Sequence, residues 1–215
     1  MFDLMKKDYV LVKKVWWLVL ALMLAMPLFL SYVSSQEGRS LPSGLLLSML
    51  ASLLVLVSIS ALYQEEEKYP KAAAMITTLG YSRKEQIRER YALALSVFVV
   101  FAVLYGIVAQ FLPGLEPLTI LGFAISYCVF SGVIALYLYL VTKLGVLAAR
   151  YVQMAVILAI SLGPTLLSML HISFSLDFLA SLSQPVLCSL LIAMGLFFYG
   201  LSYVLTVQIY LKKEL

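Results

Sequence analysis

The densest group of ionisable side chains lies between two long apolar stretches, in LYQEEEKYPKAAAMITTLGYSRKEQIRERYAL at residues 62–93. A glutamate run such as EEEKYPK could serve an intramembrane protease, but such enzymes also need histidine metal ligands or a serine–histidine pair. His171 is the only histidine, and Cys128 and Cys188 lie apart in apolar stretches without a metal-ligand spacing. We therefore predict no catalytic residue, no metal site and no directly bound cofactor, and we expect that the chain is not an enzyme.

The spacing of residues in the charged block favours two helical pieces that dock on another protein. Pro70 suits a first helical position, because that position needs no N–H group. Gly80 stands where a helix cap would lie, and Ser82 with Glu85 forms a capping box that opens a second helix. Four apolar residues between these ends share one helical face: Ala72, Met75, Ile76 and Leu79. A connector needs only a few residues, so this pattern predicts a docking element; a solvated loop that sets topology is the alternative.

The composition of the chain requires a membrane as its solvent. Of its 215 residues 63% are hydrophobic and 12% are charged, whereas soluble domains average about a quarter charged. A water-soluble fold would expose large apolar patches. Six apolar stretches approach the roughly 20 residues that a helix needs to cross a bilayer: 15–35, 44–63, 91–112, 118–141, 151–170 and 185–210. We predict an all-α integral membrane protein with six transmembrane helices in a single domain of residues 1–215.

Lysines and arginines divide unequally between the two ends of these stretches. Fourteen of the 15 fall at the end that holds both chain termini, and Arg39 alone falls at the other. Because basic loops stay in the cytoplasm, we predict a multi-pass protein of the cell membrane with both termini cytoplasmic. The first apolar stretch exceeds the roughly 7–15 residues of a signal-peptide core, so we expect it to remain as a helix.

Two segments outside the spans have patterns of their own. In residues 1–14, apolar residues recur at helical spacing beside lysines, which predicts an interfacial amphipathic helix in the headgroup plane. A basic flank that only sets topology is the alternative. Residues 171–184 form an outer loop rich in leucine and aromatic residues, and we expect this loop to dip into the interface.

The run EEEKYPKAAAMITTLGYSRKEQIRERYAL resembles the cytoplasmic segment of ABC type-2 exporter permeases, the transmembrane subunits of these exporters. More narrowly, it is similar to the small six-span permeases of phenol-soluble-modulin and antimicrobial-peptide exporters. Their pattern has an acidic E-E-K start, a short helix, a Leu-Pro or Leu-Gly break, and an S-R-K-E run before span three. Here Glu66–Lys68 match the start, Leu79 and Gly80 match the break, and Ser82–Glu85 match the last run. Gly80 stands where many relatives have proline, which changes the turn.

The resemblance implies that residues 64–90 form a coupling helix that seats in a cleft of a separate ATP-binding subunit. ATP and magnesium would then be bound by two copies of that partner, and the chain itself has no phosphate-binding G-x-x-x-x-G-K-[ST] motif. A second permease copy, in a homodimer, or a paralogue would complete the path. The residues expected to dock are Glu65, Glu66, Glu67, Lys68, Lys71, Ala72, Met75, Ile76, Leu79, Gly80, Ser82 and Arg83.

The six spans contain no charged residue, which argues against coupling to ions. We therefore expect an amphipathic or hydrophobic cargo, with a peptide favoured, and no nucleic acid as a partner. Candidate polar groups along its path are Gln110, Gln153, Ser161 and Thr165; hydrogen bonding between helices is the alternative role. A drug or lipid exporter permease and a non-transporting membrane scaffold or sensor stay open as alternatives.

Two further patterns concern helix packing. Gly122 and Ser126 form a small-x-x-x-small pair, which allows two helices to approach closely. Pro27 lies inside the first span, where it would remove a helical hydrogen bond and favour a kink.

Overall fold

The computed structural model describes residues 13–37, 43–68, 82–112, 115–152, 154–155 and 183–212. These residues form the long helices α2 (Lys13–Glu37), α3 (Ser43–Lys68), α5 (Arg83–Phe111), α6 (Ile120–Leu144) and α9 (Gln184–Lys212). The chain turns at Gly145, whose φ of 90° lies in the left-handed region that glycine tolerates. Residues 146–152 then continue as helix. The helical fold class predicted from composition is therefore confirmed for the described part of the chain.

Four described helices are long and apolar enough to cross a membrane. Their apolar ranges are Leu46–Glu66, Lys84–Phe111, Ile120–Leu144 and Gln184–Lys212, and they contain most of the predicted spans 44–63, 91–112, 118–141 and 185–210. The predicted span 15–35 lies within α2, whose described apolar stretch, Val15–Phe29, is shorter. The predicted span 151–170 lies largely outside the described residues, as do almost all of 1–14 and 171–184. Six spans therefore remain a prediction.

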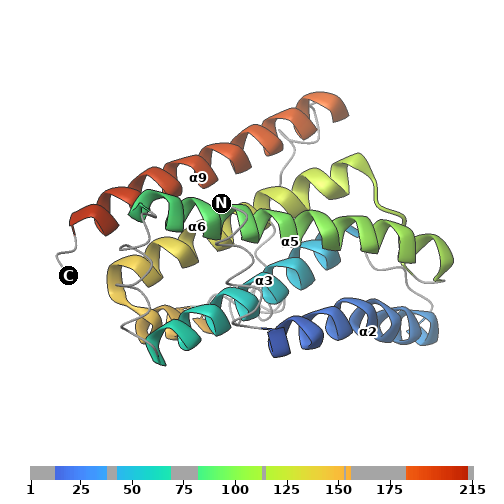
Figure 1. The fold of residues 1–215 in the computed structure, drawn as a ribbon. Coiled ribbons are helices and arrows are strands. Elements are labelled where there is room, and N and C mark those ends of the chain that lie inside the picture. Colours follow the sequence, from blue (N-terminus) through green and yellow to red (C-terminus); the bar gives the residue numbers. More distant parts are fainter. Residues whose placement is uncertain are drawn as a thin grey trace.

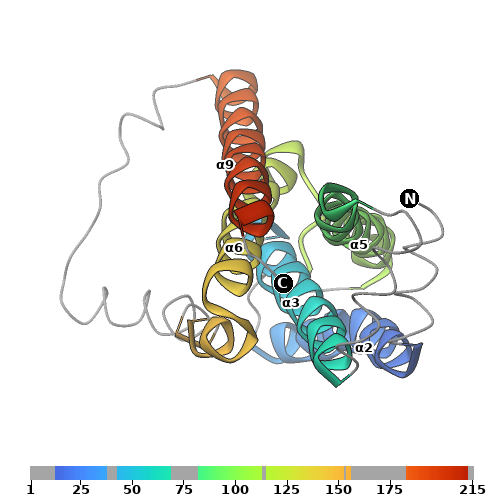
Figure 2. The ribbon, with the colours of Figure 1, turned by 60° about the vertical axis from the view of Figure 1, so that its left-hand side comes forward.

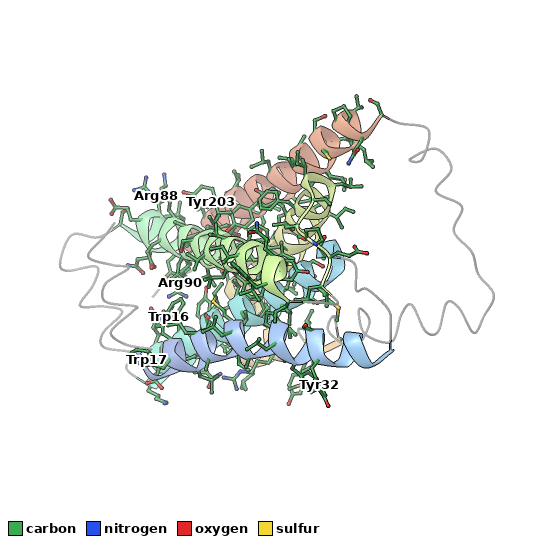
Figure 3. The ribbon with its side chains drawn as sticks, turned by 90° about the vertical axis from the view of Figure 1, so that its right-hand side faces the viewer. Trp16, Trp17, Tyr32, Arg88, Arg90 and Tyr203 are labelled. Atoms are coloured by element: carbon green, nitrogen blue, oxygen red, sulfur yellow. The ribbon has the colours of Figure 1, made fainter. Side chains whose placement is uncertain are left out.

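Exposed aromatic residues mark both ends of α2. Trp17 is 66% exposed near the start of the helix and Tyr32 is 64% exposed near its end, and Figure 3 shows them toward opposite ends of α2. Fifteen residues of helix separate them by about 22 Å. Such placement is typical of the aromatic belts at the two membrane interfaces. The helix runs through the predicted kink residue, Pro27, without a break in its assignment.

Helix α6 lies between α3 and α9, with which it makes most of its contacts. Helix α5 packs against α3 and α9, and α2 lies at the edge of the bundle against α3 and α5 (Figures 1 and 2). The core includes Phe98 of α5, which stacks on Phe130 of α6 with ring centroids 4.4 Å apart. Many large apolar side chains instead face outward, Phe197 and Leu147 among them, as expected for helices surrounded by lipid.

Helices α3 and α6 approach each other closely at two glycines. A Cβ atom on Gly44 would lie 3.1 Å from the Cα atom of Gly122. One turn further along α6, Ser126 Oγ lies 2.8 Å from the carbonyl oxygen of Gly44 and 2.7 Å from that of Gly122, so its hydroxyl donates at this crossing. The prediction that Gly122 and Ser126 permit close packing is confirmed, and Gly44 is the partner that the sequence pattern did not identify.

We predict that Gly44→Val destabilises the protein, because the new side chain would push against the α6 backbone. Overpacking of this kind costs on the order of 1–3 kcal/mol, measured as a lower midpoint of thermal unfolding in detergent. Gly106→Val is the matched control, since a Cβ atom there meets only Leu118 Cδ2, at 3.9 Å. Equal loss of stability in both variants would contradict the assigned crossing.

Candidate functional site

The candidate site lies where α3 ends and α5 begins, on either side of residues 69–81, which are outside the described part of the chain. Both helix ends lie at the same end of the bundle (Figure 1). In Figure 3, Arg90 points from α5 toward the interior of the bundle, whereas Arg88 points away from it. Arg88 and Arg90 of α5 therefore face different surroundings.

Arg90 joins the two helix ends through an ion pair and an aromatic ring. Its Nη2 atom pairs with Glu66 Oε2 of α3, and the two side chains are 13% and 24% exposed. Its guanidinium carbon lies 4.0 Å from the centroid of the Tyr63 ring. A cation over an aromatic face and beside a carboxylate is held by two attractive contacts, both strengthened by partial burial. We call Tyr63, Glu66 and Arg90 the clasp.

Local sequence explains how the clasp residues are positioned. Tyr63 and Glu66 are three residues apart, so they share one face of α3. Ser82 starts α5 with the predicted capping box: its backbone N donates to Glu85 Oε2 over 2.8 Å, and its Oγ accepts from Glu85 N over 3.2 Å. Because this cap fixes where α5 begins, it also fixes the face that Arg90 occupies two turns later.

The residue next to Arg90 binds α5 to α9. Tyr199 OH donates to the carbonyl oxygen of Tyr91 over 2.6 Å. The Tyr91 hydroxyl lies 2.7 Å from Ser202 Oγ and 3.0 Å from Thr206 Oγ1. Since Ser202 donates its own proton to the carbonyl oxygen of Ala135 over 2.6 Å, it accepts from Tyr91. This chain of hydrogen bonds joins α5, α9 and α6.

A further contact ties α3 to α6 beside the clasp. Ser60 Oγ and Tyr137 OH are 2.6 Å apart and buried, and Ser60 lies one turn before Tyr63 on α3. Consequently α3, α5, α6 and α9 are all connected by polar contacts at this end of the bundle. Side-chain hydrogen bonds between membrane helices are modest individually, at about 0.6 kcal/mol, so the connection depends on their number.

The predicted docking residues fall into three groups. Glu66 turns inward to the clasp. Lys68 Nζ instead pairs with Glu65 Oε1 over 2.5 Å, and the side chains of Lys68 and Glu65 are 60% and 32% exposed. Ser82 caps α5, and Arg83 and Glu67 lie in the terminal turns of α5 and α3. The others lie outside the described residues: Lys71, Ala72, Met75, Ile76, Leu79 and Gly80. Docking on a partner therefore stays a prediction.

Sequence reasoning missed the inward-facing residues of the α5 stem. Glu89 is only 2% exposed and Gln86 accepts from Tyr210 OH over 3.4 Å, although both stand in the charged run. Their positions continue a buried face of α5 backward along the helix, from Val97 through Leu93. The helical period extended from the core into the charged run could have identified this inner face.

One predicted cargo-path residue lies in a groove. Gln110 is exposed on α5 and lines a hollow of about 500 Å³ between α5 and the start of α6, together with Gly106, Pro117 and Phe123. Gln153, Ser161 and Thr165 lie outside the described residues. The structure thus places Gln110 at this hollow, and its part in a cargo path stays a prediction.

We predict that the clasp stabilises the protein beyond what an exposed ion pair does. In a double-mutant cycle of Glu66→Gln and Arg90→Gln, the coupling energy should be about 1–3 kcal/mol, from denaturant unfolding in micelles. The same cycle on Glu65→Gln and Lys68→Gln is the control, and it should give less than about 0.5 kcal/mol because that pair is solvated. Equal coupling energies in the two cycles would show that the clasp is only a surface contact.

Comparison with known proteins gives a family match over nearly the whole chain. A family model described as "ABC-2 family transporter protein" matches residues 3–211. No curated protein and no solved structure matches the chain. Members of this family are multi-pass membrane subunits of ABC transporters and partner with an ATP-binding subunit. They form the transport component of the transporter and not its catalytic component. The match extends over nearly the whole chain, and the four long apolar helices are those expected of a membrane subunit. The chain therefore belongs to the ABC-2 family of transporter proteins as a transmembrane permease subunit.

Proposed function

We propose that this permease exports an amphipathic or hydrophobic cargo, foremost a peptide, out of the cell. Energy would come from two ATP-binding subunits that grip residues 65–85, and a second copy of the chain would complete the path as a homodimer. The observation that carries the proposal is the clasp, which joins the helices entering and leaving that segment. Peptide cargo is favoured by the resemblance of residues 65–93 to peptide exporters.

The clasp supports coupling because it makes α3 and α5 respond together. A partner that pulls on residues 69–81 acts on the end of α3 and the start of α5 at once. Without a contact between these ends, each helix could shift separately and the motion would be lost in the connecting residues. With Arg90 held by Glu66 and Tyr63, the two ends move as one unit. Tyr91 passes the same motion to α9 through Ser202 and Thr206.

The polar groups of the described spans favour an apolar or amphipathic cargo. Residues 44–63, 91–111, 120–142 and 184–211 contain no Asp, Glu, Lys or Arg, so they offer no counter-charge to an ion. The buried hydroxyls of Ser126 and Ser202 are engaged within the bundle. The hollow beside Gln110 combines apolar walls with one exposed amide, which suits a molecule with both characters.

We predict that Met75→Asp and Leu79→Asp uncouple the exporter while leaving it folded and inserted. A charge on the expected docking face would have to be desolvated against the partner, which costs several kcal/mol. In liposomes that hold the permease and its ATP-binding subunit, both variants should lower permease-stimulated ATP hydrolysis by tenfold or more, as about 1.4 kcal/mol corresponds to tenfold.

The control for these variants is Thr77→Asp, which adds the same charge to the opposite face of the expected helix. It should retain ATPase stimulation and co-purification with the partner. If Met75→Asp and Leu79→Asp keep full stimulation, residues 65–85 are not the docking element. A permease that never stimulates the ATPase, in any variant, would instead support the scaffold or sensor alternative.

We also predict that transport continues when the proton gradient is removed. Inside-out vesicles receive ATP at constant concentration in the outer solution, and uptake of a fluorescent amphipathic helical peptide is followed before and after addition of a protonophore. The rate should be unchanged, because the described spans offer no ionisable relay. Collapse of transport at constant ATP would show that ions supply the energy.

A further inference from the structure

We propose that a groove between α6 and α9 binds one acyl chain of an anionic phospholipid, with the lipid phosphate held by Lys143. The groove has a volume of about 340 Å³ and faces outward from the bundle. The residues that line it are Gly132, Ala135, Leu136, Tyr139, Phe198, Leu201, Ser202 and Leu205. We call it the α6/α9 groove. This inference goes beyond the proposed export function and does not depend on the cargo.

The groove lies where α6 and α9 contact each other and also make contacts with different neighbouring helices. At the close contact, a Cβ atom on Gly195 would lie 2.9 Å from Ser131 Oγ, and Ser202 donates to the carbonyl oxygen of Ala135. Further along, Thr206 and Tyr210 bind α9 to α5, whereas Tyr137 binds α6 to α3 through Ser60. Beyond their shared contact the two helices are therefore anchored to different neighbours, and the groove lies between them.

Gly132 leaves open the end of the groove that is farther from Lys143. A Cβ atom on Gly132 would meet no atom within 4 Å, so the absence of a side chain there is not needed for close helix packing. The walls are apolar and partly exposed, with Phe198 at 44% and Leu201 at 47%. The volume is within the range of roughly 300–1,000 Å³ that is usual for small-molecule sites.

The positive charge of Lys143, beside Tyr139 at one end of the groove, selects an anionic lipid. Lys143 Nζ lies 3.3 Å from the hydroxyl of Tyr139, which lines the groove, and 5.5 Å from the centre of its ring. Within the described part of the chain, the ammonium group of Lys143 has no carboxylate within ion-pair distance. An exposed cation at the mouth of an apolar groove is complementary to an anionic head group above an acyl chain.

The length of the groove agrees with a lipid of one leaflet. Eleven residues separate Gly132 from Lys143, and a helix rises about 1.5 Å per residue, so the groove and its cation extend over about 16 Å. This is close to half of the roughly 30 Å hydrocarbon core. Lys143 lies at the basic end of the bundle, which the positive-inside rule assigns to the cytoplasm. The lipid therefore belongs to the cytoplasmic leaflet.

The test compares phosphatidylglycerol with phosphatidylcholine of identical acyl chains. The full-length permease is delipidated, transferred to mixed micelles that contain both lipids, and the retained lipids are counted by native mass spectrometry. We expect preferential retention of one phosphatidylglycerol per chain, by about fivefold, since one surface cation contributes about 1 kcal/mol. Lys143→Gln should abolish the preference, and Lys143→Arg should keep it.

Filling the groove separates this site from general lipid binding. Gly132→Leu should lower retention of both lipids, because its side chain occupies the space of the acyl chain. Gly200→Leu is the matched control: Gly200 is exposed on α9, its Cβ position is equally open, and it does not line the groove. Equal retention of both lipids by the unmodified protein overturns the proposal. So does a preference that survives Lys143→Gln, or equal losses from Gly132→Leu and Gly200→Leu.

Discussion

Lipid chains are as apolar as leucine, so burying apolar side chains gives membrane helices little reason to associate. This constraint explains which contacts hold the bundle together. Helices must gain dispersion energy from close approach, or make hydrogen bonds that lipid cannot offer. Gly44 against Gly122 provides the first kind of contact. Ser126, Ser202 and Tyr91 provide the second, because each makes a hydrogen bond to another helix.

The same constraint explains the position of the clasp. An arginine and a glutamate deep in the bilayer would be costly, but at the helix ends they are only partly withdrawn from water. There Arg90 can hold Glu66 and cover the ring of Tyr63 at moderate cost. The end of the bundle nearest the expected ATP-binding partner is thus also where ionic contacts between helices are affordable. In the proposed exporter, structural and coupling roles coincide in these few side chains.

Local patterns explain what could be predicted from the sequence. Four spans follow from the length and hydropathy of single segments, and the Ser82 capping box follows from a spacing of three residues. The clasp could not be predicted, because its partners are 24 residues apart and EEE offers three candidates for Arg90. Which glutamate faces α5 depends on the rotation of α3, and that is set by packing against α6. The burial of Glu89, by contrast, follows the helical period of the buried residues further along α5 and could have been predicted.

Arg90 and Tyr91 are neighbours in sequence, yet one binds α3 and the other binds α9. Successive residues of a helix point about 100° apart, so these two anchors restrain α5 from two directions. Turning α5 about its own long axis would improve neither contact and would break at least one. Sliding or tilting can preserve both if the neighbouring helices follow. The bundle therefore favours piston or rocking motions over twisting, and this restricts how a transport path between its helices could open.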